Sequence, residues 1–201
     1  AESDLYVDGE FDPVTGIAVA DMDHDGHAEI VAGRVILNDD LSERGVGRSG
    51  RGCDNFVGLD GLWGEGSMPA IADMDLDGVD EVIVGDAFYN PDGQEIMKTH
   101  GDDGAPAIAN LDGDPEGEYV RATYSKLVAH DTDGTELWTF ELPGAGAEND
   151  GIMSNASIAD IDGDGLPEVV AARANALWAV NGEDGSVLWK AKITDTTGAT
   201  G

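Results

Sequence analysis

The chain has few basic residues, a single cysteine and no long apolar segment. It contains 10 lysines and arginines against 42 aspartates and glutamates, so its formal net charge is −32. A field of this sign repels nucleic acid and anionic membrane surfaces. No run of about 18 apolar residues occurs, and we therefore expect no membrane-spanning helix. Cys53 has no partner for an internal disulfide, which leaves a free thiol or an intermolecular bridge.

Motifs of common enzyme chemistry are missing as well. The sequence has no GxSxG elbow for a nucleophilic serine and no HxxxH pair for zinc among its four histidines. Close carboxylate pairs, which glycosidases use, are frequent, but most of them belong to four acidic loops. We therefore predict a protein that is not an enzyme, and we keep a polysaccharide-active enzyme as an alternative.

Those four acidic loops are the main positive feature of the sequence. Each has nine residues, and they begin at Asp21, Asp73, Asn110 and Asp160. Side-chain oxygens at loop positions 1, 3, 5 and 9 can converge on one hard cation, and a backbone carbonyl at position 7 can complete the shell. We therefore predict up to four bound calcium ions. The predicted metal ligands, with position 7 contributing its carbonyl, are Asp21, Asp23, Asp25, His27, Glu29, Asp73, Asp75, Asp77, Val79, Glu81, Asn110, Asp112, Asp114, Glu116, Glu118, Asp160, Asp162, Asp164, Leu166 and Glu168.

The loops differ from EF-hands, which need a bidentate glutamate at position 12 and a helix on each side. Position 12 holds Ala32, Val84, Arg121 and Ala171, and short β-branched runs flank each loop. Each loop is therefore predicted to join two buried strands.

The third loop departs from the pattern of the other three. Asn110 replaces the first aspartate, and Pro115 stands where the other loops have a turn glycine. Asparagine still offers an oxygen ligand, so we expect reduced calcium affinity at this loop, which is the least certain of the four sites.

The recurrence of the loops predicts a repeat protein. Their spacing is compatible with propeller blades of about 40 to 50 residues. After the second, third and fourth loops, two further short segments are joined by Asp-Gly turns, which are typical of β-hairpins. We predict an all-β fold, a β-propeller or partial propeller with about four blades of four antiparallel strands.

We expect a single propeller-like domain over residues 1–201. The predicted blades cover approximately 14–56, 66–100, 104–142 and 153–193, and the glycine-rich stretch 43–66 is expected to be an elaborated loop. Arg44, Arg48 and Arg51 cluster there, either tied to nearby acids or available to an acidic glycan or partner. A closed four-bladed ring, a part of a larger ring and an open array closed by another chain all remain open.

The segment 69–85, PAIADMDLDGVDEVIVG, resembles the FG-GAP/VCBS repeat, the calcium-binding blade of integrin-α-like propellers and of many secreted bacterial proteins. The resemblance covers about residues 14–190, and the Asp-Gly-Ser-Val-Leu-Trp ending at Trp189 is similar to the bacterial versions. It implies a propeller whose calcium sites brace loops on one face, with ligands at Asp21, Asp23, Asp25, Glu29 and their equivalents. Such propellers often have seven blades, whereas four are visible here.

These features together favour a calcium-stabilised, non-catalytic module for binding, adhesion or surface assembly. Weak calcium loops fill at the millimolar calcium found outside cells, so we expect an extracellular or cell-surface location. No signal peptide is recognisable, and a start at Ala1 fits a processed mature terminus. The expected partners are a protein or glycan at the cell surface, or further copies or chains that complete the propeller. A structural subunit of a filament or multichain assembly is the alternative.

Overall fold

The computed structural model describes residues 16–50, 53–57, 63–66, 68–123, 125–143, 155–173 and 176–193, with only the backbone for 53–57 and 63–66. Over these ranges the chain forms eighteen β-strands and no helix. No helix in the described part is therefore long and apolar enough to cross a membrane.

Sixteen of the strands form four antiparallel sheets, here called blades 1 to 4. In blade 1 the strands are β1 (Ile17–Ala20), β2 (Glu29–Ala32), β3 (Val35–Leu37) and β4 (Glu43–Val46). In blade 2 they are β7 (Pro69–Ala72), β8 (Glu81–Val84), β9 (Ala87–Tyr89) and β10 (Glu95–Lys98). In blade 3 they are β11 (Ala105–Ala109), β12 (Glu118–Ala122), β13 (Lys126–His130) and β14 (Glu136–Glu141). In blade 4 they are β15 (Ser157–Ala159), β16 (Glu168–Arg173), β17 (Ala176–Asn181) and β18 (Val187–Lys192).

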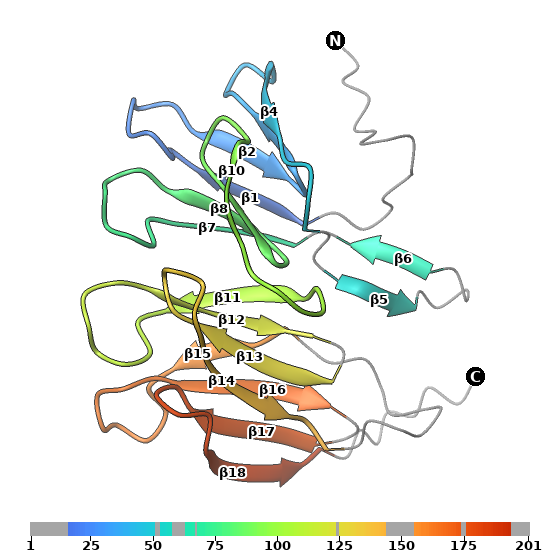
Figure 1. Cartoon of the computed structure of the whole chain (residues 1–201), viewed down its shortest axis with the longest axis vertical. Coiled ribbons are helices and arrows are strands. Elements are labelled where there is room, and N and C mark those ends of the chain that lie inside the picture. The colour runs from blue at the N-terminus through green and yellow to red at the C-terminus, as the bar shows by residue number, and fades with distance from the viewer. Residues whose placement is uncertain are drawn as a thin grey trace.

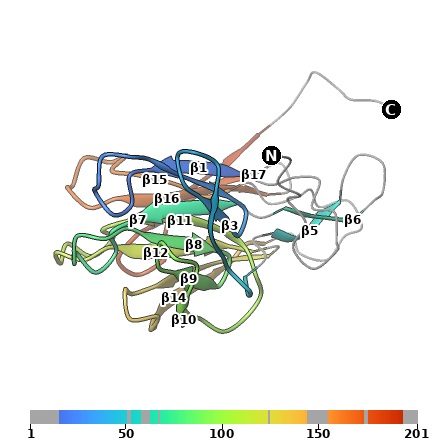
Figure 2. The same cartoon turned by 90° about the horizontal axis from the view of Figure 1, so that it is seen from above.

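The blades follow one another in chain order, with blade 1 and blade 4 at opposite ends of the series (Figure 1). The first strands of the four sheets lie next to each other in turn, β1 beside β7, β7 beside β11 and β11 beside β15. The fourth strands β10 and β14 lie on the opposite side of the molecule (Figure 2). Each sheet runs outward from its first strand, as in a propeller. The predicted fold class, all-β with four blades of four antiparallel strands, is confirmed as a partial propeller.

The hydrophobic core is divided among the three junctions between neighbouring blades. Val31 and Ile36 of blade 1 pack with Val82 and Val84 of blade 2. Tyr119 of blade 3 packs with residues of blade 2, and the largest cluster joins blades 3 and 4. Because each sheet is apolar on the faces that meet a neighbour, a blade is stable only when another blade covers it.

A turn that contains a residue with a positive φ angle joins the third and fourth strands in every blade. Gly93, Gly134 and Gly185 take positive φ angles of 75°, 83° and 68° in blades 2 to 4. Leu41 takes the equivalent place in blade 1 with φ 65°, and its N–H donates to the carbonyl of Asn38 at 2.9 Å. A leucine in this conformation is strained, because its Cβ crowds the neighbouring carbonyl oxygen.

Leu41→Gly is therefore expected to stabilise the chain by about 0.5–1 kcal/mol, although glycine adds entropy to the unfolded state. The Leu41 side chain is 60 % exposed, so little packing is lost. Leu137, in β14 and 38 % exposed, is the matched control, and Leu137→Gly is expected to destabilise the chain. Denaturant unfolding of both variants in calcium measures the difference, and equal destabilisation by both would contradict the assignment of strain to Leu41.

The stretch 43–66 differs from the predicted elaborated loop. Glu43–Val46 is β4, the fourth strand of blade 1, and β5 (Cys53–Val57) pairs with β6 (Trp63–Gly66) as a separate hairpin. The glycines hide the alternation that predicts a strand, but Gly45 permits a close approach between blades. A Cβ added at Gly45 would lie 2.2 Å from the carbonyl oxygen of Asp92 in blade 2. The side chains of Arg51 and Cys53 lie outside the described residues.

Candidate metal sites

Each predicted calcium loop joins the first and second strands of its blade. Loop 1 (21–29) follows β1, loop 2 (73–81) follows β7, loop 3 (110–118) follows β11 and loop 4 (160–168) follows β15. All four loops lie along one edge of the partial propeller (Figure 1). The sequence predicted these connections correctly, since two short strands flank every loop.

A buried glutamate at position 9 anchors every loop. Glu29, Glu81, Glu118 and Glu168 are at most 7 % exposed, although each carries an ionisable group. In every loop the Oε2 atom of this glutamate accepts a hydrogen bond from the backbone N–H at position 2, at 2.8–3.0 Å in loops 1, 2 and 4. One carboxylate oxygen of this glutamate thus closes each loop. Of the other oxygens, Oε1 of Glu29 lies beside Arg44, and Oε1 of Glu118 is buried without a hydrogen-bond partner among the described residues.

The aspartates at positions 1 and 5 fold the loops into tight turns. At position 1, Asp21 and Asp73 accept the N–H of the glycine at position 6 through Oδ2 at 2.9 and 3.0 Å. At position 5, Oδ1 accepts the N–H of position 7 at 2.8–2.9 Å in all four loops. These bonds direct the carboxylates toward the centre of the loop without using all of their oxygens.

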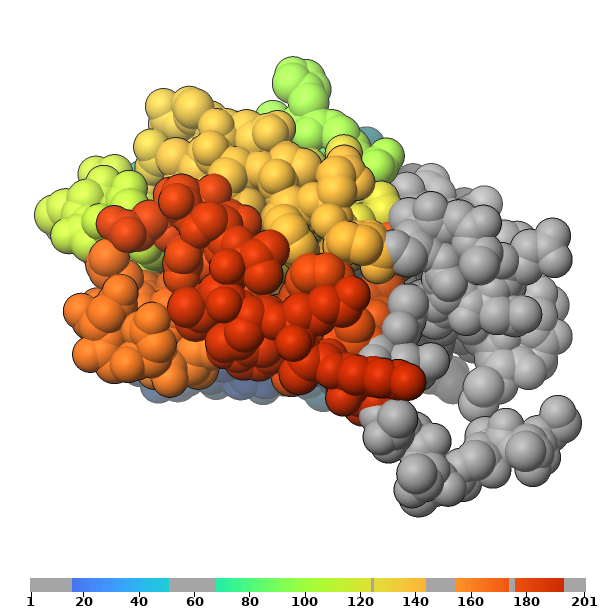
Figure 3. All heavy atoms as spheres, turned by 90° about the horizontal axis from the view of Figure 1, so that it is seen from below, coloured from blue at the N-terminus to red at the C-terminus, as the bar shows by residue number. Residues whose placement is uncertain are grey.

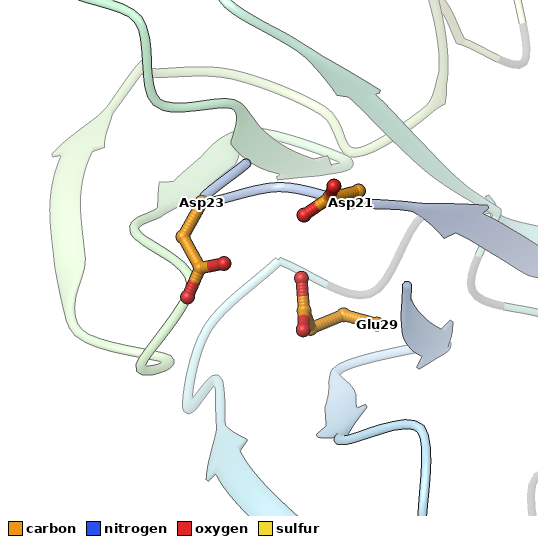
Figure 4. Close-up of side chains that lie close together, drawn as sticks. All are labelled: Asp21, Asp23 and Glu29. Carbon is orange, nitrogen blue, oxygen red and sulfur yellow. The ribbon is translucent and has the colours of Figure 1, made fainter. Parts of the chain in front are cut away.

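In every loop, three carboxylates offer oxygens that lie within 4.8 Å of one another. Loop 1 brings together Asp21, Asp23 and Glu29, whose carboxylates converge in Figure 4. The other three clusters are made of Asp73, Asp75 and Glu81 in loop 2, Asp112, Asp114 and Glu118 in loop 3, and Asp160, Asp162 and Asp164 in loop 4.

Four buried carboxylate oxygens in these clusters have no hydrogen-bond partner among the described residues. They are Asp21 Oδ1, Asp23 Oδ1, Asp73 Oδ1 and Glu118 Oε1. A buried carboxylate oxygen without a donor is costly, and a cation removes that cost. A donor set made only of carboxylate oxygens suits a hard divalent cation. Loops 1 to 3 therefore fit such an ion, and the acids of loop 4 form a more exposed cluster.

Burial and mutual repulsion also perturb the acids of these loops. Burial raises the pKa of Glu81 to about 7, with the charges of Asp75, Asp77 and Asp73 adding to the shift. Burial likewise raises the pKa of Glu118. Burial thus disfavours the charged form of both glutamates, and a bound cation would offset that cost.

Some predicted ligands lie apart from the three-carboxylate clusters. Asp25, Asp77 and Glu168 belong to none of these clusters. Asn110 uses its amide within loop 3, because Oδ1 accepts the Gly113 N–H at 2.7 Å and Nδ2 donates to the Asp114 carbonyl. Because both polar atoms of its side chain are already hydrogen-bonded, Asn110 is expected to be a weaker calcium ligand than the aspartate at position 1 of the other loops. The carbonyls of the position-7 residues stay predicted ligands: His27, Val79, Glu116 and Leu166.

Loop 1 differs from the others because a guanidinium lies against it. Arg44 in β4 donates through Nη2 to Asp23 Oδ2 at 2.7 Å, and Nη1 lies 3.3 Å from Glu29 Oε1. Its Nε also donates to Asp92 Oδ1 of blade 2 at 3.2 Å. The hydrogen bond from Arg44 lowers the pKa of Asp23. The sequence suggested that Arg44 is tied to acids, but only the fold shows that two of them belong to a candidate metal site.

We expect Arg44→Gln to raise the calcium affinity of loop 1 by about tenfold, because a positive charge beside two ligands repels the ion. The same change removes the tie to Asp92, so the calcium-free chain should melt at a lower temperature. Calcium titration calorimetry and thermal melts measure both effects. Arg48→Gln, at an exposed arginine of the same segment, is the control for loss of charge. Equal affinities for the two variants would show that Arg44 does not oppose calcium.

No protein-family model matches the sequence, and no curated protein matches it. The fold itself has relatives among solved structures. The V. cholerae biofilm matrix protein Bap1 superposes with a TM-score of 0.63 at 23 % identity, covering 88 % of this chain and 28 % of that one. A structure of BBS1N in complex with ARL6DN gives a TM-score of 0.59 at 13 % identity, covering 91 % of this chain and 57 % of that one.

These similarities establish a propeller-like fold and no shared activity, because both identities lie below 25 %. The chain spans less than two thirds of the length of either protein. With no matching family model, membership of the FG-GAP/VCBS family stays a prediction.

Proposed function

We propose that this chain is a calcium-stabilised, non-catalytic binding or surface-assembly module of the FG-GAP/VCBS type that works outside the cell. The observation that carries the proposal is the set of four acidic loops along one edge, three of which hold buried carboxylate oxygens without a hydrogen-bond donor. A rigid scaffold with braced loops is a common platform for recognition, since the loops can vary while the sheets stay constant.

Two further observations support an extracellular role. The similar fold of a biofilm matrix protein is compatible with assembly at a bacterial surface. Calcium loops that close through a few carboxylates are well suited to the millimolar calcium found outside cells. The net charge of −32 disfavours nucleic acid as a partner.

The acids of the described loops close the loops through hydrogen bonds, and their remaining oxygens converge in clusters that suit a cation. These two roles account for the acids without general acid–base work. This supports the hypothesis of a non-catalytic module over that of a polysaccharide-active enzyme.

The test is a binding and turnover assay on immobilised acidic and neutral polysaccharides and on bacterial surfaces. We expect retention in calcium, release in chelator, and no new reducing or unsaturated ends in the supernatant. Product release in calcium would overturn the non-catalytic assignment, and retention unaffected by chelator would overturn the role of calcium.

A further inference from the structure

The residue at loop position 2 locks each blade to the next one. Met22 is fully buried in the core between blades 1 and 2, and Met74 is 1 % exposed in the core between blades 2 and 3. Leu111 is fully buried between blades 3 and 4. Ile161 has the same position in blade 4 and is 44 % exposed. No further blade packs against it among the described residues. Blade 4 thus presents the inserting half of a junction.

A backbone hydrogen bond accompanies the first two insertions. The N–H of Asp80, at position 8 of loop 2, donates to the carbonyl of Met22 at 3.0 Å. The N–H of Gly117, at position 8 of loop 3, donates to the carbonyl of Met74 at 3.2 Å. Pro167 holds position 8 in loop 4 and has no N–H to donate. Position 8 of one loop and position 2 of the preceding loop therefore form a repeated inter-blade contact.

The donor and the acceptor of this inter-blade hydrogen bond are each found unpaired at one end of the described chain. Ala28 holds position 8 of loop 1, and within the described residues its N–H has no backbone acceptor outside the strand ladders. The carbonyl of Ile161 likewise has no such donor there. A donor remains on blade 1 and an acceptor on blade 4, which is the pairing used at the first two junctions.

Blade 1 also exposes the apolar surface that receives an inserted residue. Val19, two residues before loop 1, is 60 % exposed, and Ile17 is 70 % exposed. The equivalents of Val19 all pack into the core shared with the preceding blade: Ile71, Ile108 and Ile158. Ile30 is half-buried. Its equivalents are at most 1 % exposed: Val82, Tyr119 and Val169. Among the described residues, no blade covers this face of blade 1.

The far face of blade 4 is open in the same way. Val170 in β16 is half-buried, whereas its equivalents Val31, Ile83 and Val120 are fully buried by the following blade. Figure 3 views this end of the molecule, where strands and loops of blade 4 form the outer surface. The two ends are thus different from each other and complementary in chemistry.

We propose that blade 4 of one copy of this chain docks onto blade 1 of a second copy, head to tail. Ile161 of the first copy inserts beside Val19 and Ile30 of the second, and the Ile161 carbonyl accepts the Ala28 N–H. A second copy of the chain offers each end face the same groups that it would meet at an internal junction between blades. The contact is heterologous, so it closes a ring when the rotation permits and otherwise continues as an open array.

Charge determines the conditions in which copies associate. Each copy carries −32, so copies repel at low salt, and filled calcium loops together with added salt reduce that repulsion. The proposal rests on the calcium loops of the proposed function, because the loop holds position 2 in place. Calcium-dependent melting is measured alongside association, so failure of docking and failure of calcium binding are distinguishable.

Sedimentation velocity of the chain in millimolar calcium and high salt is expected to show association that increases with protein concentration. Ile161→Asp damages the inserting face and Val19→Asp damages the receiving face. Each variant alone should associate more than about tenfold more weakly, because the interface would bury an unpaired charge. An equal mixture of the two should form a one-to-one pair, since each retains the face that the other lacks.

Ile96→Asp is the matched control, because Ile96 is 54 % exposed on β10, away from both end faces. It should associate like the unaltered chain, and all three variants should keep the calcium-dependent melt. A chain that stays monomeric in calcium and high salt while keeping that melt overturns the docking proposal alone. A mixture that remains monomeric, or an Ile96→Asp variant as weak as Ile161→Asp, overturns it as well.

Discussion

Removal of calcium is expected to lower the melting temperature of this chain by about 20 °C, reversibly. An ion present at about 100 times its Kd contributes about 2.7 kcal/mol, and 1 kcal/mol moves the melting temperature of a chain of this size by about 2–4 °C. Three or four filled loops therefore account for the expected shift. The structural reason is the set of unpartnered buried oxygens on Asp21, Asp23, Asp73 and Glu118, added to a net charge of −32.

The measurement is a thermal melt in millimolar calcium, in chelator, and after calcium is added back. Sodium chloride at matched ionic strength is the control for general screening of the charge. Magnesium is expected to restore less stability, because it requires near-ideal octahedral geometry at shorter distances than these flexible loops favour. A melt that is identical in calcium and in chelator contradicts the metal sites, and full rescue by sodium chloride would assign the effect to screening.

Glu81→Gln is expected to have opposite effects on stability with and without calcium. Its amide oxygen can still accept the Met74 N–H, which Glu81 Oε2 accepts at 2.9 Å, so the loop stays closed. In calcium the variant loses a charged ligand, and an affinity about 100-fold lower costs about 2.7 kcal/mol at that loop. In chelator it removes a carboxylate that is buried near three aspartates, and we expect a gain of about 1 kcal/mol at about pH 8.

The raised pKa of Glu81 determines how the stability of the calcium-free chain changes with pH. Burial raises the pKa of Glu81 from its usual 4.5 to about 7 in the folded, calcium-free chain. Its contribution to stability is therefore fully present below about pH 4.5 and is lost as the pH rises through about 7. The Glu81→Gln variant in chelator should lack this loss. Denaturant unfolding between about pH 5 and 8 measures the difference, with Glu183→Gln as the control at an exposed glutamate. The same sign of change in calcium and in chelator would contradict the ligand role.

The prediction that two strands flank each acidic loop was correct because the relevant contacts are local. Oxygen ligands at fixed spacing, turn glycines and β-branched flanks all act within about a dozen residues, so the sequence predicts strand, loop and strand in each blade. The glycine-rich stretch 43–66 behaved differently. There Glu43–Val46 is a strand that pairs with β3 in a hairpin, and Gly45 in it fits against Asp92 of blade 2, a contact that is not local in sequence.

Other features of the sites depend on residues far apart in the chain. Nothing in the pattern of loop 1 indicates that Arg44 would bind both Asp23 and Glu29 while also contacting blade 2. The residue at position 2 is simply apolar in the sequence, as in Met22 and Ile161. Only the structure shows that the residue at this position packs between blades, because Met22 is buried there whereas Ile161 in blade 4 is exposed.

The sequence alone determined that this chain is an acidic, all-β repeat protein with four acidic loops between strands, because composition, hydrophobic alternation and turn chemistry are properties of short segments. The tertiary structure decided how the repeats fit together. It placed the four loops on one edge, set Arg44 against loop 1, buried Met22, Met74 and Leu111 between blades, and left Val19 and Ile161 exposed at the two ends. These outcomes depend on packing between residues distant in the chain, which no local pattern specifies.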